Sequence, residues 1–508
     1  MSETLLSMRK ITKRFPGVLA NDEISFDLFK GEIHALVGEN GAGKTTLMKI
    51  LYGLYSPDSG EIYIKGKRIT IKNPKEAING GIGMVHQHFM LVPPFTVLEN
   101  IIIGEETKKF GLLDESLPAE KIKALMEKNG LIVDLNSRVE DVPVGLQQRV
   151  EILKILYRGA EILVFDEPTA VLTPQEVEDL FKTFRQLISQ GKGIVFISHK
   201  LDEVLEIADR ITVIRKGRVI KTLNRDEATK SLIAELMVGK PVLLEVSRPD
   251  VKEGPAVLEV KYLSLQDYRK VNILTDVSFT VHAGEIYGIA GVEGNGQTEL
   301  VEVIAEAAPI LHGDILLNGE SITNWDVRQR REAGISHIPE DRHRYGLLLP
   351  FSLAENLTLG MHHKEPFVNR FQIINKNKIR EHAKAVIEKF DIRTPSELTT
   401  ALALSGGNQQ KVIVARELST EPKLLLAAQP TRGVDIGATE FIHNQLMIAK
   451  KEGRAVLLVS ADLDEVMSLS DRIGVMFKGR IIKEFEREKT TKEEIGFYMM
   501  GEKEHAGN

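Results

Sequence analysis

Short runs of apolar residues alternate along the chain with longer segments in which apolar residues recur at helical spacing. Three such runs are Ile33–Val37, Ile162–Phe165 and Ile194–Ser198. Runs of this kind are typical of strands buried on both faces, and the amphipathic segments between them are typical of helices that cover a sheet. The pattern predicts α/β domains, each built on a mostly parallel central sheet.

The whole pattern occurs twice. Lys44 aligns with Gln297 at an offset of 253 residues, and from Gly145 and Gly407 onward the offset is 262. A repeat of this length indicates duplicated domains and not a solenoid. We therefore expect one domain at 1–243, a linker of mixed charge with prolines near its ends at 244–255, and a second domain at 256–508.

Composition narrows the function classes. The 508 residues are 27% charged and 43% hydrophobic, with a net charge of −6 and no cysteine. The negative charge gives no reason to expect nucleic acid as a partner, and the absence of cysteine excludes disulfides and thiolate metal sites. No apolar run approaches the roughly 18 residues that span a bilayer, and the first residues lack the apolar core of a signal peptide. We expect a cytosolic protein that reaches a membrane only through a partner.

A glycine-rich loop follows the first of these strands and precedes a helical run. Its residues are Gly38, Glu39, Asn40, Gly41, Ala42, Gly43, Lys44 and Thr45, with Thr46 beginning the run. Glycines let backbone N–H groups surround a phosphate, Lys44 reaches the β- and γ-phosphates, and Thr45 is a ligand for Mg²⁺. A turn with a chance lysine is the alternative, which the order of strand, loop and helix disfavours.

Two acidic residues follow the second strand. Asp166 stands where a carboxylate can hold Mg²⁺, and Glu167 where one can orient or deprotonate an attacking water. A solvated acidic turn is the alternative, and it would be favoured if the glycine-rich loop were missing.

A serine and two glycines occur only in the second half. Ser405, Gly406 and Gly407 precede the helical pattern Val412–Arg416, so they predict a second anion cradle at a helix start. Taken alone, the same residues would be a helix-capping loop.

Together these motifs resemble the ATP-binding subunits of ABC transporters, over nearly the whole chain and in two copies. The resemblance implies two tandem P-loop NTPase domains of ABC-ATPase type, each with a helical subdomain, and ATP and Mg²⁺ as cofactors. It implies further roles for Gln87, which senses Mg²⁺ and the membrane partner, for the switch residue His199, for Asp435 of the D-loop and for Phe15, which stacks on adenine. Without the family, Phe15 would be an ordinary core residue, since buried aromatics are common.

The cluster His86-Gln87-His88 could suggest a metal site. Side chains two apart on a strand point to opposite faces, and no carboxylate follows closely, so the sequence does not favour one.

In this family, the P-loop of one domain and the signature motif of the other enclose each ATP. One such site would combine Lys44, Gln87, Asp166, Glu167 and His199 with Ser405, Gly406, Gly407 and Asp435. The other would contain Gln297, Glu340, Ala428, Gln429 and Ala461, facing Pro143 in place of the signature serine and Thr173 in place of Asp435. We expect one hydrolytic site per chain, with Glu167, His199, Gln87 and Lys44 as its catalytic residues.

The asymmetry of the two copies resembles that of importers of monosaccharides and nucleosides. The segments 83–91 and 338–347 resemble the nucleoside branch more closely, so nucleoside is the expected substrate and a ribose- or galactose-type sugar the alternative. The resemblance implies two integral-membrane permeases, an extracytoplasmic binding lipoprotein and a place at the cytoplasmic face of the membrane, with no nucleic acid.

Tandem ABC ATPases that act on ribosomes or DNA are a different class. Members that act on ribosomes have two competent sites joined by a long charged linker, and members that act on DNA carry cysteine zinc modules. Neither description fits this sequence. A regulator that binds ATP without transport is a third class, which the presence of both Glu167 and His199 disfavours.

Overall fold

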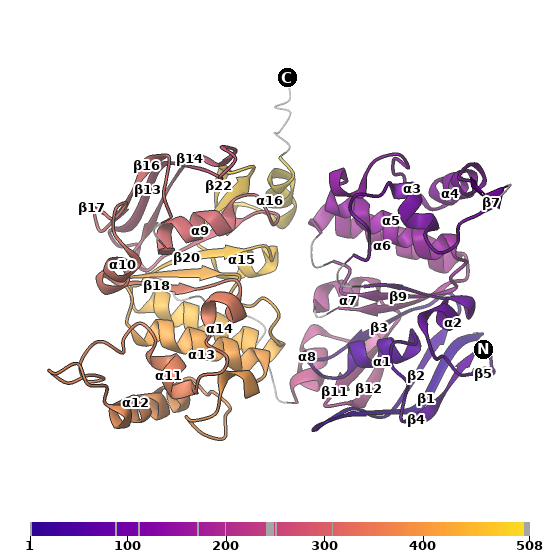
Figure 1. The fold of residues 1–508 in the computed structure, drawn as a ribbon, viewed down its shortest axis with the longest axis horizontal. Helices are drawn as coiled ribbons and strands as arrows, with labels where there is room; N and C mark the ends of the chain where they lie inside the picture. The colour runs from indigo at the N-terminus through magenta and orange to yellow at the C-terminus, as the bar shows by residue number, and fades with distance from the viewer. Residues whose placement is uncertain are drawn as a thin grey trace. The chain divides into compact units, whose positions relative to one another are not determined.

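The computed structural model divides the chain into two compact units, Met1–Val242 and Leu243–Asn508. It describes residues 3–86, 89–109, 112–169, 172–198, 200–239, 248, 251–306 and 308–501. Each unit has the same layers, as Figure 1 shows: an antiparallel sheet, a central sheet with a helix between the two, and further helices on the far face of the central sheet.

Unit 1 contains two sheets. The antiparallel sheet has the order β2 (Val18–Phe29), β1 (Thr4–Phe15), β4 (Ser59–Ile64), β5 (Lys67–Ile69). The central sheet has the order β12 (Arg218–Asn224), β11 (Arg210–Arg215), β3 (Ile33–Val37), β10 (Gly193–Ile197), β9 (Ile162–Asp166), β6 (Ile82–Val85). Only the β11–β12 pair is antiparallel in this second sheet, and a two-stranded ribbon is formed by β7 (Lys108–Lys109) and β8 (Leu112–Leu113).

The helices of unit 1 fall into two groups. The first packs on or beside the central sheet: α1 (Lys44–Leu51), α2 (Pro74–Asn79), α6 (Pro174–Ser189), α7 (Leu201–Ile207), α8 (Lys230–Val238). The second forms the helical subdomain: α3 (Val97–Ile102), α4 (Ser116–Asn129), α5 (Val144–Tyr157).

Unit 2 repeats this order. Its antiparallel sheet is β14 (Asn272–His282), β13 (Ala256–Gln266), β16 (His312–Leu317), β17 (Glu320–Ser321). Its central sheet is β22 (Arg480–Glu486), β21 (Arg472–Phe477), β15 (Ile286–Ala290), β20 (Ala455–Ser460), β19 (Leu424–Ala428), β18 (Ile335–Ile338). Its helices are α9 (Gln297–Glu306), α10 (Val327–Ala333), α11 (Leu353–Thr358), α12 (Lys376–Lys389), α13 (Gly406–Ser419), α14 (Ile436–Lys451), α15 (Leu463–Leu469), α16 (Lys492–Met499).

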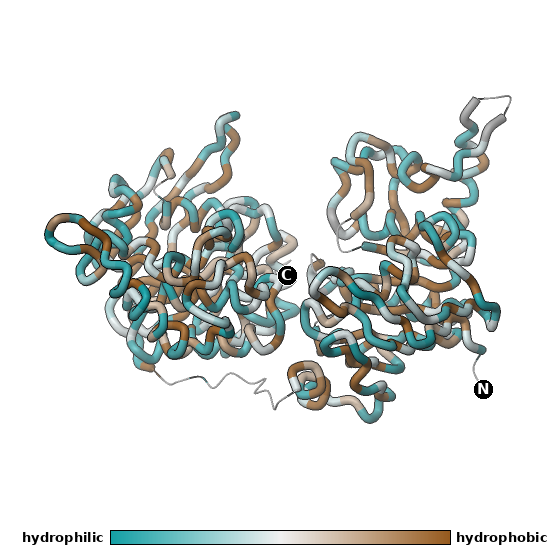
Figure 2. The backbone as a smooth tube through the Cα atoms, turned by 60° about the horizontal axis from the view of Figure 1, so that its bottom comes forward, coloured by the Kyte–Doolittle hydropathy of each residue, from teal (hydrophilic) through white to brown (hydrophobic). Residues whose placement is uncertain are grey.

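The central strands are buried on both faces, as their apolar runs predict. In β19, Leu425 and Ala427 belong to the core under the helical layer, whereas Leu424, Leu426 and Ala428 belong to the core under the antiparallel sheet. Along the tube in Figure 2, hydrophobic and hydrophilic stretches alternate within both units. The predicted fold class, two α/β domains with mostly parallel sheets and helical subdomains, is confirmed.

Candidate nucleotide site

The glycine-rich loop of unit 1 lies between β3 and α1, as predicted. Gly41 and Gly43 have φ angles of 80° and 107°, in the left-handed region that favours glycine. A Cβ on Gly43 would lie 2.3 Å from the carbonyl oxygen of Ala20, and one on Gly38 would lie 2.3 Å from that of Ile214. At both glycines the loop thus packs too closely against a neighbouring strand or loop to admit a side chain, and its backbone with the start of α1 forms a cradle for an anion.

Lys44 is the first residue of α1 and its side chain folds back over the loop. Nζ donates hydrogen bonds to the carbonyl oxygens of Gly38 at 2.6 Å and Glu39 at 3.1 Å. Burial lowers the pKa of Lys44, although the charges of Glu167 and Asp166 act to raise it. A mostly buried cation beside a ring of backbone N–H groups is suited to a phosphate chain.

Asp166 ends β9 beside this loop, and Glu167 follows it. Burial, together with the charge of Glu167, raises the pKa of Asp166 to about 6, against the opposing effects of Lys44, Lys49 and a hydrogen bond with Thr45. The structure thus brings the threonine hydroxyl and the strand-end carboxylate together. Oxygen donors of these two types are the ligands that Mg²⁺ prefers.

Glu167 has an unusual backbone. Its φ angle is 50°, and its N–H donates to the carbonyl oxygen of Ile197 on the neighbouring strand at 2.9 Å. A non-glycine residue in this region is uncommon, and such residues cluster at active sites. The chain turns here so that Glu167 leaves the strand on the same edge as Lys44.

The signature residues lie at the start of α13 in unit 2. The helix begins at Gly406, so Ser405 and the two glycines lie at a helix start, as predicted. Ser405 has the N-cap position without a side-chain capping bond, and its exposed Oγ accepts a hydrogen bond from Asn408 Nδ2 at 3.0 Å.

Asp435 lies against this helix start. A Cβ on Gly407 would lie 2.9 Å from Asp435 Oδ2, so the signature glycine and the D-loop residue are in close contact. Asp435 also caps α14, since its Oδ1 accepts from the N–H of Ala438 at 2.8 Å.

Phe15 is not a core residue. It ends β1 with 36% of its surface exposed and contacts the edge of Tyr55 at a centroid distance of 5.3 Å. Gln87 and His199 lie outside the residues that the structure describes, and so does His88 of the histidine cluster. Their roles stay predictions.

The equivalent loop of unit 2 keeps the backbone conformation of the first loop and lacks its lysine, since Gln297 stands at that position. Gln297 Nε2 donates to the carbonyl oxygen of Val292 at 3.0 Å, the equivalent of the bond from Lys44 to Glu39. Its Oε1 accepts from the N–H of Asn295 at 3.1 Å, which uses one of the loop's own donors.

Sequence reasoning missed a polar network around this second loop. Thr298 Oγ1 donates to Glu340 Oε2 at 3.0 Å, and the Arg432 guanidinium pairs with Glu340 and, at 3.0 Å, with Glu293. A 580 Å³ cavity lies against these residues. Arg432 and Glu340 are 92 positions apart, so the sequence could have suggested this ion pair only through their opposite charges.

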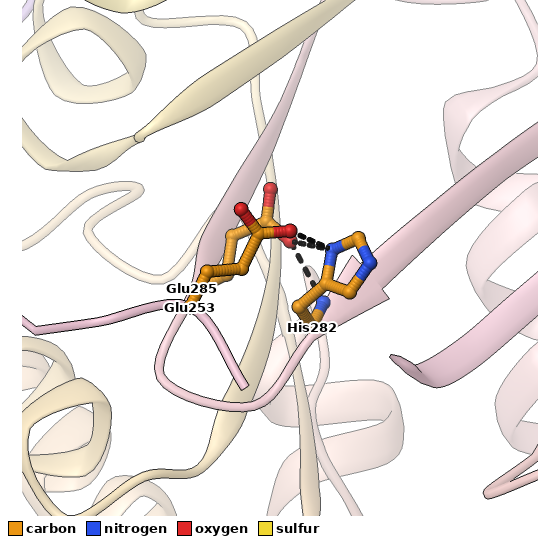
Figure 3. A group of neighbouring side chains, drawn as sticks. All are labelled: Glu253, His282 and Glu285. Carbon is orange, nitrogen blue, oxygen red and sulfur yellow. Dashed lines mark hydrogen bonds and ion pairs between the residues drawn. The ribbon is translucent and has the colours of Figure 1, made fainter. Parts of the chain in front are cut away.

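One further group of side chains could hold a metal ion. Figure 3 shows Glu253, His282 and Glu285, with His282 Nδ1 at 2.7 Å from Glu253 and 3.0 Å from Glu285. In unit 1, Glu32 accepts from the N–H of Phe29, the equivalent of His282, at 2.7 Å. Glu285 therefore has a turn-closing role common to both units, and His282 adds a contact to Glu253, within the segment expected to be the linker.

Comparison with known proteins gives a consistent result. The family model described as ABC transporter matches residues 21–170 and 274–432. The guanosine import ATP-binding protein NupO of Bacillus subtilis is 48% identical, with 98% of each chain covered. The nucleoside import ATP-binding protein NupA of Lactococcus lactis is 49% identical, covering 98% of this chain and 99% of the relative. The ribose import ATP-binding protein RbsA 1 of Rubrobacter xylanophilus is 40% identical, with 97% of each covered.

Proposed function

This chain belongs to the ABC transporter family of ATP-binding proteins, and on that premise we propose that it is the ATP-hydrolysing subunit of a nucleoside importer. The chain is an ATPase of the import type, and its expected similarity to both nucleoside and sugar importers is confirmed. Nucleoside as the substrate is supported by identities of 48% and 49% to guanosine and nucleoside importers, against 40% to a ribose importer.

We assign ATP hydrolysis to unit 1 because Lys44, Asp166 and Glu167 lie together there, at one loop and one strand end. Unit 2 has Gln297, Ala428 and Gln429 at the equivalent positions. An amide cannot accept a proton as a carboxylate does, so we propose a single hydrolytic centre based on unit 1, completed as the family implies by Ser405, Gly406, Gly407 and Asp435.

The residues around the unit 1 loop fit Mg²⁺ bound with the nucleotide. Thr45 and Asp166 would hold it, since this hydroxyl and this buried strand-end carboxyl are already hydrogen-bonded to each other. When bound, the ion neutralises charge on the phosphates. Gln87 is the further ligand that the family implies.

The protein's own groups have separate roles in binding and hydrolysing the nucleotide. The loop N–H groups and Lys44 bind and orient the phosphates, and Phe15 offers an exposed ring on which the base can stack. Glu167 is placed to orient the attacking water and take its proton. His199 is proposed to touch the γ-phosphate.

The partners follow from the family and not from this chain. We propose two membrane permeases and an extracytoplasmic binding protein, with this chain at the cytoplasmic face of the membrane. No helix among the described residues is long and apolar enough to cross a bilayer.

Uptake measurements test the substrate. Cells that lack this chain should lose uptake of labelled guanosine and adenosine and keep that of ribose, and a wild-type copy should restore it whereas Glu167→Gln should not. Lost ribose uptake with unchanged nucleoside uptake would replace the nucleoside assignment by the sugar one. Co-purification of ribosomes or DNA instead of two multi-span membrane proteins would contradict transport altogether.

A further inference from the structure

The segment that follows Glu340 is longer in unit 2 than the equivalent segment of unit 1. Asn100 and Asn356 are equivalent, since Oδ1 of each accepts from the N–H of the residue eight positions before it. Asn100 comes 13 positions after Gln87, whereas Asn356 comes 16 positions after Glu340. Unit 2 therefore has three extra residues here, and they precede Leu348.

These residues form a π-helical turn, Arg342–Gly346, that is held against α13. Asp341 caps the turn, because its Oδ1 accepts from the N–H groups of the second and third residues of the turn at 2.9 and 3.1 Å. At the other end, the Arg416 guanidinium of α13 donates to the carbonyl oxygen of Gly346 at 2.8 Å. Single π-helical turns are rare and frequently occur at functional sites.

Arg342 extends from this turn to the segment before Asp435. Its Nη1 donates to the carbonyl oxygen of Arg432 at 3.0 Å, and its Nη2 donates to that of Gly433 at 3.2 Å. Gly433 has a φ angle of 66°, in the left-handed region, and lies two residues before Asp435. One planar guanidinium thus holds two successive carbonyl groups of the turn that leads to the D-loop aspartate.

The same guanidinium lies against the signature motif. A Cβ on Gly406 would lie 3.3 Å from Arg342 Nη2 and 3.6 Å from the carbonyl oxygen of Gly433. The next signature residue, Gly407, is in close contact with Asp435. The signature, the D-loop segment and the π-helical turn therefore meet at half-buried Arg342.

The arginine occurs in the unit that has the intact signature. Unit 1 has no arginine between Gln87 and Val92, and Pro143 stands there in place of Ser405. An arginine at this place and a complete signature are thus found together in one unit, and the sequence of the other unit lacks both. This association is expected if the arginine serves the signature.

We propose that Arg342 is a positioning residue for ATP hydrolysis, which fixes Gly406 and the turn before Asp435 in one arrangement so that both reach the phosphates together. The inference rests on the proposed function, in which these residues complete the site of unit 1. Arg342 acts through the signature and does not bind the nucleotide. Its removal should therefore slow turnover and leave the binding of ATP by the loop of unit 1 unchanged.

An arginine that only stabilises unit 2 would behave differently. Loss of folded protein lowers activity by the same factor whether or not the signature is intact. A positioning effect requires a working signature to act on, so it should disappear when the signature is already disabled. A double-mutant cycle separates these two roles.

The experiment measures steady-state phosphate release by the full chain. Arg342→Ala should lower kcat by at least about tenfold, because small misplacements in a site are costly, and should change the KM for ATP by less than about twofold. In the Ser405→Pro background, measured with γ-labelled ATP, the same substitution should lower kcat by less than about twofold. Arg342→Lys should give an intermediate kcat, since an ammonium group lacks the fork that holds two carbonyl groups.

Arg344→Ala is the matched control, because it removes the same charge from the same turn. The Arg344 guanidinium lies 5.0 Å from the ring centroid of Tyr345, and its loss should leave kcat within about twofold of wild type. Thermal unfolding checks that each variant is folded, and Arg342→Lys takes the place of Arg342→Ala in the cycle if the latter does not fold.

Two results would overturn the proposal: a kcat for Arg342→Ala equal to that for Arg344→Ala, or the same fold-loss of kcat with Ser405 and with proline at that position. Failure of the proposed function has a separate signature. It would be seen as ATP hydrolysis that persists in Glu167→Gln, whatever the result for Arg342→Ala.

Discussion

Gly41 and Gly43 in the first loop have φ angles of 80° and 107°, and Gly294 and Gly296 in the second have 86° and 102°. Glu167 and Gln429 likewise share a left-handed backbone, at 50° and 47°. The two loops thus have one backbone and two sets of side chains. Their difference teaches that the fold fixes the shape of this site, whereas a few side chains decide whether the shape catalyses a reaction.

Among substitutions that exchange residues between the two units, the one at Glu167 should have the largest effect on ATP hydrolysis. Glu167→Gln gives unit 1 the side chain of unit 2 and should lower the rate of ATP hydrolysis by about 10²–10⁴-fold, because the general base is lost. Steady-state phosphate release measures it. The reciprocal Gln429→Glu is the control and should not raise turnover, since Ala461 stands where unit 1 has His199. Substantial activity in Glu167→Gln would refute a single hydrolytic centre.

The next largest effect is expected at the signature positions, where Ser405 precedes α13 and Pro143 precedes α5. Ser405→Pro copies Pro143 into the signature motif and removes a hydroxyl and an N–H, so ATP turnover should fall by about 10²–10³-fold, as for other lost transition-state donors. Pro143→Ser should change turnover less than twofold, by about a few tenths of a kcal/mol in barrier. Equal effects of the two variants would show that the first signature still works.

Much of this comparison was predictable from the sequence, and some was not. The strand at Ile33–Val37, the loop after it and the strand-end acids follow from local patterns, since apolar runs and glycine spacing are short-range signals. The start of α13 after Ser405 was predictable too, since a serine before two glycines and a helical pattern indicates a helix start. The Arg432–Glu340 pair depends on the arrangement of neighbouring strands, which no local pattern contains.

Two buried residues at equivalent positions, one in each unit, should give the units a different dependence of stability on pH. His34 of unit 1 is 1% exposed, and burial lowers its pKa to about 3, with a hydrogen bond to Thr212 at 2.8 Å. Its equivalent, Tyr287, bonds Glu484 at 2.9 Å. Since the unfolded chain takes up a proton near pH 6.5 and the fold does not, His34 lowers the stability of unit 1 as the pH falls from 6.5 toward 3.

Urea unfolding between pH 7 and pH 5 measures this difference. Wild-type unit 1 should lose about 1–2 kcal/mol through His34 over that range, and His34→Phe should remove that loss. Tyr287→Phe is the control and should leave the pH dependence unchanged. An identical slope in wild type and His34→Phe would contradict the assignment.

The smallest effect is expected at the linker side of unit 2. His282→Phe copies Phe29 and removes the contact with Glu253, whose side chain is 57% exposed, so the free energy of unfolding should change by less than about 1 kcal/mol. Thermal unfolding measures it. Glu285→Gln, which disturbs the buried turn shared by both units, should cost more, and the reverse order would show that the cluster of Figure 3 has a further role.

The left-handed turn that Glu167 and Gln429 share also bears on how such proteins change over time. A strained backbone conformation that survives in a copy without hydrolytic chemistry is maintained by the strands around it. A single substitution at this position can therefore switch a general base off or on without a new loop having to evolve. Return of hydrolysis to unit 2 would also require a lysine, an aspartate and a histidine at Gln297, Ala428 and Ala461, so loss of activity in one copy is an accessible outcome of gene duplication and its reversal is a distant one.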